Sequence, residues 1–173
     1  IARRQRQMCI RDRFRDNRIT PIYEGTNSVQ AIDLVYRKIL NNKIFEKYIT
    51  QLSNEVKDFA KDNKLSLFAD KFFKYLELLN NFTLWLGEKN KSSKDDVSAA
   101  CNDYLKVLGY IALAHSWLKI LKVSHSKLKE NKTFYEDKIN TAKYYFDKIL
   151  PRVQSHYLSA ITGSDTMMKS NFN

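Results

Sequence analysis

Residues 66–86, SLFADKFFKYLELLNNFTLWL, decide the fold class. Their apolar side chains return every three or four residues, which is the spacing of one face of an α-helix. The face consists of Phe68, Phe72, Tyr75 or Leu76, Leu79, Phe82 and Leu86. Because a stripe of this kind must be buried against other elements, the stretch predicts a long amphipathic helix in a packed core.

The same spacing recurs on both sides of this stretch and predicts further helices over 29–39, 45–59, 97–118 and 135–157. Breaks are expected at 41–42, at the polar run 87–93 (GEKNKSS) and at Asn131. Pro151 predicts a kink or break in the last helix, and Gly163 predicts its end. Long helices joined by short polar loops are typical of antiparallel bundles.

Composition agrees with an all-α fold. Only 4 Gly and 2 Pro occur in 173 residues, too few for the turns of a many-stranded protein. The predicted architecture is an antiparallel bundle of about four long helices, preceded by an extended strip at 19–23 and one helix. No run of 18 apolar residues occurs, so no membrane span is expected.

Cysteine and histidine usage limits the chemistry. Cys9 and Cys101 do not make a disulfide framework, so a reducing, cytoplasmic location is expected. Only three histidines are present, and no metal site is predicted. His115 and Cys101 lie on the apolar face of the helix over 97–118, where a hydrogen-bonded core histidine and a small buried hydrophobe are expected.

The net charge of +11 is unevenly distributed. Seven of the nine arginines lie in the first 18 residues, and lysine replaces arginine after them. This break predicts that residues 1–13 are a foreign or disordered arm. Beyond it, lysines alternate with acidic residues, as in 55–58 and 136–138. That pattern is typical of a solvated helix face, so no nucleic-acid partner is expected.

Residues 14–38, FRDNRITPIYEGTNSVQAIDLVYRK, combine a strip that Pro21 keeps out of a helix, a turn at 24–27 and a helix start. Thr26, Asn27 and Ser28 place hydroxyls, an amide and free N–H groups at that start, where the polar part of an anionic cofactor can bind. The alternative is a turn with a capping threonine and a solvent-facing glutamate.

The stretch RDNRITPIYEGTNSVQAIDL strongly resembles the C-terminal signature of the acyl-CoA dehydrogenases. Its form is most similar to a branch that carries an extra C-terminal helical domain and includes the 3-methylmercaptopropionyl-CoA dehydrogenases. Residues 103–110 (DYLKVLGY) and 142–146 (AKYYF) resemble motifs of that extra domain. Tyr36 departs from the small residue usual in this branch. The resemblance implies that residues 14–40 end the catalytic domain and that 41–173 form the additional bundle.

The resemblance also implies roles for individual residues. Glu24 matches the base that removes the α-proton of an acyl thioester while a hydride passes to FAD. Such a base has to stand within hydrogen-bond reach of the proton it takes. The remaining matches are substrate-lining positions, Tyr23 and Gly25, and cofactor-binding positions, Thr26, Asn27, Ser28 and Gln30. The implied partners are an acyl-CoA, an electron-transfer flavoprotein and further copies of the full-length parent.

Enzymes of this kind are several times longer, so the chain is expected to be a C-terminal piece that is inactive alone. The alternative function is a non-catalytic helical module for interaction or oligomerisation. The two differ at Glu24, which the enzyme needs at a concave edge facing the flavin and which the module leaves in open solvent.

Overall fold

The computed structural model of the chain describes residues 12–19, 26–41 and 44–169. Within these ranges every regular element is a helix and no strand occurs. In chain order the elements are η1 (Asn17–Ile19), α2 (Asn27–Ile32), η2 (Asp33–Leu40), α3 (Ile44–Ala60), α4 (Ser66–Ser92), α5 (Lys94–Ser126), α6 (Lys132–Tyr144), η3 (Tyr145–Ile149), α7 (Arg152–Ala160) and α8 (Asp165–Met168).

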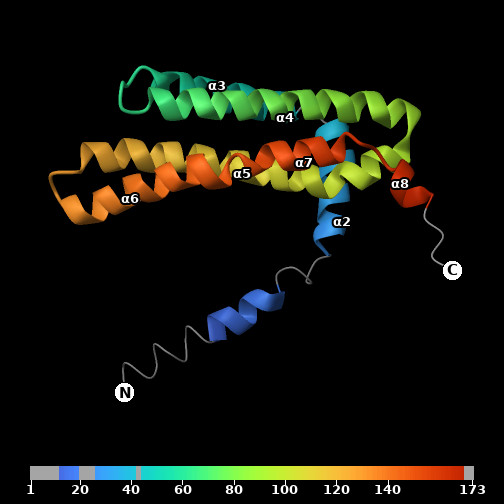
Figure 1. The fold of residues 1–173 in the computed structure, drawn as a ribbon, viewed down its shortest axis with the longest axis horizontal. Helices are drawn as coiled ribbons and strands as arrows, with labels where there is room; N and C mark the ends of the chain where they lie inside the picture. The colour runs from blue at the N-terminus through green and yellow to red at the C-terminus, as the bar shows by residue number, and fades with distance from the viewer. Residues whose placement is uncertain (1–11, 20–25, 42–43, 170–173) are drawn as a thin grey trace.

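The long helices run back and forth as an antiparallel bundle (Figure 1). α3 and α4 lie side by side, α5 packs against α4, and α6, η3 and α7 return along α5 as one nearly continuous rod. α2 and η2 cross this bundle at a steep angle, with α2 packed on α5. The predicted all-α bundle, with one helix in front of it, is confirmed.

The predicted apolar faces form the core. Phe72, Phe82 and Tyr104 are fully buried, and the Phe82 and Tyr104 rings meet edge to face at 5.1 Å. The Tyr104 hydroxyl pairs with Thr83 Oγ1 at 2.8 Å, so this large buried side chain keeps its polar atom satisfied. Cys101 is 1% exposed and its Sγ donates to the carbonyl of Val97, which confirms it as a small core residue.

The predicted loop over 87–93 is wrong, because α4 continues to Ser92 and only Ser93 separates it from α5. Gly87 does not interrupt the helix, and lysines favour the carbonyl end of a helix. One of them, Lys89, pairs with Asp96 across the turn at 3.0 Å. Ser93 is extended, with φ −148°, and its hydroxyl accepts from the backbone of Asp96 to cap α5. One residue thus replaces the expected loop.

Pro151 breaks the last rod as predicted. It has no N–H and its ring crowds the carbonyl four residues before it, so an ordinary α-helix cannot run through it. The chain widens instead into the π-helix η3, in which Leu150 N donates to the carbonyl of Tyr145 at 2.8 Å. α7 then begins at Arg152. Gly163 follows the helix end with φ +81°, as expected of a residue that stops a helix.

The extended strip predicted over 19–23 is wrong at its first residue, Ile19. Residues 12–16 are α-helical and Ile19 ends the 3₁₀ turn η1. Pro21 restricts residue 20 but leaves Ile19 free to turn. The rest of the predicted strip, 20–23, and most of the arm, 1–11, lie outside the described residues. The break expected at 41–42 is confirmed at Asn41, where η2 has ended.

In the described ranges no helix combines the length and apolar character needed to cross a membrane.

Candidate functional site

Three residues of the predicted site, Tyr23, Glu24 and Gly25, lie outside the described residues. The described chain resumes at Thr26 and enters α2 directly. The structure therefore fixes the helix that follows the candidate base, and the roles of these three residues stay predictions.

The start of α2 has the geometry of a capped helix N-terminus. Thr26 is extended, with φ −65° and ψ 164°, and its hydroxyl accepts from Val29 N at 3.5 Å. Thr26, Asn27 and Ser28 are all exposed. The first N–H groups of a helix have no partners within it and carry partial positive charge, so this end can meet the anionic part of a ligand.

Gln30 occupies the next turn of α2. Its backbone N–H donates to the carbonyl of Thr26 at 3.0 Å, which closes the first helical turn, and its side chain is exposed. A role for Gln30 in supporting the cofactor-binding turn remains a prediction.

The bundle holds the start of α2 in place. Asn102 of α5 donates from Nδ2 to Ser28 Oγ at 3.1 Å, although the two residues are 74 apart in sequence. Ala31 and Val35, on the inner face of α2 and η2, are fully buried. The predicted site residue Ser28 is therefore tied to the bundle by a polar contact next to an apolar one. No spacing pattern in the sequence indicates the role of Asn102.

Tyr36 is the residue that departs from the resembled pattern, and it makes a second link to the bundle. Its hydroxyl donates to the carbonyl of Lys94 at 3.0 Å and lies 3.1 Å from Ser98 Oγ. Both partners belong to the first turns of α5. The large side chain thus fastens η2 to the start of α5.

The half-buried His115 joins α5 to α3. Its Nε2 lies 2.9 Å from Glu55 Oε2, and Lys119 Nζ lies 2.9 Å from the same oxygen. Hydrogen bonds from Lys119 and Gln51 lower the pKa of Glu55 to about 2, whereas burial, helped by the Lys119 charge, lowers the pKa of His115. A neutral imidazole donating to an ionised carboxylate is a structural contact, which confirms the prediction of a hydrogen-bonded core histidine.

A second histidine contact ties α7 to α5. His156 Nδ1 lies 2.8 Å from Asp103 Oδ1, and the ring stacks on Tyr110 at 5.9 Å between centroids. Among the described residues, no three His, Cys, Asp or Glu side chains gather closely enough to hold a metal ion.

The family model described as "Acetyl-CoA dehydrogenase C-terminal like" matches residues 52–171, more than two thirds of the chain. The chain belongs to this family. The match runs from the middle of α3 through α8, so the bundle is the C-terminal-like domain of an acyl-CoA dehydrogenase relative. No curated protein matches the chain.

The matched domain includes both downstream motifs, residues 103–110 and 142–146, and it leaves the strip before α3 outside. Asn102 lies inside the matched domain, whereas its partner Ser28 lies before it. The contact between these two residues therefore joins the family domain to the segment that carries the predicted site.

Proposed function

We propose that the chain is the C-terminal part of an FAD-dependent acyl-CoA dehydrogenase, an oxidoreductase that introduces an α,β double bond into an acyl-CoA thioester. The observation that carries this proposal is the order of two features in one chain. The signature strip RDNRITPIYEGTNSVQAIDL, residues 15–34, precedes a domain, matched over residues 52–171, that belongs to the acyl-CoA dehydrogenase C-terminal-like family.

In this proposal Glu24 is the catalytic base. An α-proton next to a thioester carbonyl is weakly acidic, so its removal requires a carboxylate held within hydrogen-bond reach. Tyr23 and Gly25, on either side of it, line the substrate. Because α2 follows at once and is fixed on the bundle through Ala31 and Ser28, the polypeptide just after the base has a firm support.

The start of α2 suits the anionic part of FAD. Thr26, Asn27 and Ser28 offer hydroxyl and amide groups and the unpaired N–H groups of a helix N-terminus, which are the donors that phosphate groups bind. All three side chains are exposed, which leaves them accessible to one edge of the proposed cofactor. Bound FAD supplies the ring that accepts the hydride. The residues of this chain hold the cofactor's polar edge and take the proton.

The form of the strip and the motifs at 103–110 and 142–146 favour the 3-methylmercaptopropionyl-CoA dehydrogenase-like branch. We assign residues 14–40 to the end of the catalytic domain and 41–173 to the additional bundle. The proposed partners are an acyl-CoA, an electron-transfer flavoprotein and further copies of the full-length enzyme. The cytoplasmic location stays a prediction from cysteine usage.

The test is an anaerobic titration of the full-length polypeptide with 3-(methylsulfanyl)propanoyl-CoA and, in parallel, with butanoyl-CoA. Bleaching of the flavin absorbance by either thioester supports the proposed reaction, and faster bleaching by the first supports the branch. A flavin that neither thioester bleaches, although dithionite reduces it, contradicts the reaction.

The second candidate is a non-catalytic module for interaction or oligomerisation. The observation in its favour is the outer face of α2, where Val29 is 54% and Ile32 is 44% exposed. Apolar side chains on a helix that crosses a bundle can pack on another protein surface. The titration separates the candidates, because a module without catalysis leaves the thioester unchanged.

A further inference from the structure

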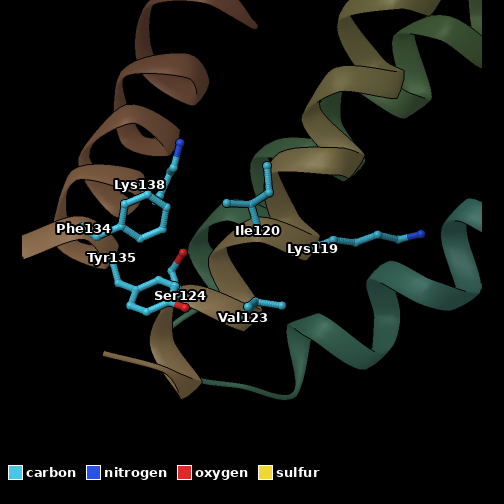
Figure 2. A pocket seen from close by; sticks show the side chains of 7 residues that line it. All are labelled: Lys119, Ile120, Val123, Ser124, Phe134, Tyr135 and Lys138. Atoms are coloured by element: carbon cyan, nitrogen blue, oxygen red, sulfur yellow. The ribbon is translucent and has the colours of Figure 1, made fainter. Parts of the chain in front are cut away.

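An apolar groove lies at the end of the bundle where α5 and α6 meet (Figure 2). Its volume is about 340 Å³, within the range of small-molecule sites. α6 packs mainly on α5, and the only buried residue of α6 is Ala142. The first turns of α6 therefore leave part of α5 uncovered.

The walls of the groove are apolar but reachable from solvent. Ile120 is 37% exposed, Val123 48% and Phe134 49%. Figure 2 shows Ile120 and Val123 of α5 on one side of the groove, with the Phe134 ring of α6 on the other. Side chains of this kind, left partly uncovered around a hollow, fit a hydrocarbon chain.

Two hydroxyl groups line the same groove without a partner in the described part of the chain. Ser124 is 1% exposed, and its hydroxyl makes no hydrogen bond to another described residue. Among the described residues, every completely buried polar side-chain atom has a hydrogen-bond partner. Because the Ser124 hydroxyl has no such partner, it is not completely buried, and its remaining exposed surface faces the groove. Tyr135 contacts the Phe134 ring, and its hydroxyl is likewise unpaired within the described residues. Buried hydroxyls normally have partners, so the Ser124 hydroxyl points to a ligand that accepts a hydrogen bond. The partly exposed Tyr135 hydroxyl, on the same groove, is available to donate a second one.

The charge around the groove favours an anionic ligand. Lys138 Nζ stands 5.2 Å from the centre of the Phe134 ring, and it forms no ion pair with a described residue. Its flexible stem lets the ammonium group swing over the groove. Lys119, by contrast, projects away from α6 and pairs with Glu55. Residues 119–143 carry seven lysines against three acidic residues, so the surrounding field is positive.

We propose that this groove binds a single-chain anionic amphiphile, a fatty carboxylate, independently of the proposed dehydrogenase reaction. The hydrocarbon chain lies against Ile120, Val123 and Phe134. The carboxylate accepts hydrogen bonds from the hydroxyls of Ser124 and Tyr135 and is neutralised by Lys138.

The test is calorimetric titration of the 173-residue chain with dodecanoate below its micelle concentration, with amide chemical-shift mapping to locate the site. Dodecanoate saturates one site, and the shifted amides lie between residues 119 and 138. Acetate, which has the head group alone, and dodecyltrimethylammonium, which has the opposite charge, each bind at least about tenfold more weakly.

Lys138→Glu, at the rim, weakens dodecanoate binding by about tenfold or more. Lys143→Glu makes the same charge change on the same helix outside the groove, and it changes binding by less than about twofold. Ser124→Ala, which deletes only the hydroxyl, weakens binding by roughly three- to tenfold. Circular dichroism verifies that each variant is folded.

Three results would overturn the proposal. They are the absence of saturable binding, equal binding of the cationic amphiphile, and equal effects of Lys138→Glu and Lys143→Glu. Sedimentation of the unliganded chain adds a fourth, because self-association that Phe134→Glu abolishes would show that a second copy fills the groove.

Discussion

Ser164 donates two hydrogen bonds to one oxygen of Asp96, from its backbone N and from its Oγ, each 2.8 Å long. The residues are 68 positions apart, and the contact joins the first turn of α5 to the segment between α7 and α8. The second oxygen of Asp96 accepts from Lys89 at 3.0 Å. One carboxylate thus fastens the end of α4, the start of α5 and the C-terminal segment together.

Replacing Asp96 is expected to destabilise the bundle. Asp96 is 8% exposed, and Asp96→Ala leaves the Ser164 and Lys89 donors without their acceptor. We expect a loss of about 2 kcal/mol in the free energy of unfolding, measured by urea denaturation. Asp95→Ala removes the exposed neighbouring acid from the same turn and serves as the control, with a change of less than about 0.5 kcal/mol. Equal effects of the two variants would refute the fastening role of Asp96.

Asp96 also predicts a pH dependence of stability. Hydrogen bonds from Lys89 and Ser164 lower the pKa of Asp96 to about 2, below its ordinary value of 3.8. A carboxylate whose folded-state pKa is lowered contributes stability above its unfolded pKa and loses that contribution as the pH falls toward the folded value. The native chain should therefore lose more stability than Asp96→Asn between about pH 4 and pH 2. Parallel stability curves for the two proteins would contradict this.

Gly163 is required beside this contact. Its φ is +81°, and a Cβ added there would lie 3.0 Å from Asp96 Oδ1. Gly163→Ala should cost about 1–2 kcal/mol through backbone strain and crowding. The control is Gly109→Ala on α5, where an added Cβ meets nothing within 4 Å and should stabilise the helix by roughly 0.5–1 kcal/mol. Thermal denaturation of both variants checks the opposite signs.

The 173-residue chain alone is expected to bind FAD weakly. The proposed cofactor positions that the structure describes, Thr26, Asn27, Ser28 and Gln30, are exposed, and in the proposed function they supply only one edge of the FAD site. Equilibrium dialysis with FAD should show no stoichiometric complex at micromolar concentrations. A yellow protein that keeps one flavin per chain after gel filtration would contradict this prediction.

The sequence predicted the bundle because burial imposes a regular spacing, and Phe72, Phe82 and Tyr104 lie in the core as that spacing requires. It failed at residues 87–93, where polar composition indicated a loop. In the structure the lysines of this run lie in the last turns of α4, where positive charge is favourable, and Lys89 forms an ion pair with Asp96 across the turn. Composition cannot reveal such a partner, because it depends on how α4 and α5 are placed.

From the sequence alone, only those residues of the candidate site that belong to the signature motif can be predicted. The resemblance of residues 15–34 indicates Glu24 and its neighbours directly. The supports of α2, by contrast, come from Asn102 and from the partners of Tyr36 on α5. These residues are 58–74 positions away from the ones they contact, and no local pattern relates them.

The role of Glu24 as base is tested most directly by Glu24→Gln in the full-length enzyme, with Glu46→Gln on α3 as a matched control. Gln keeps the size of the side chain but cannot take a proton, so turnover of the acyl-CoA should fall by roughly 10²–10⁴-fold or more while flavin content stays at the native level. Glu46→Gln should retain native turnover. Native turnover in Glu24→Gln would contradict the assignment of the base.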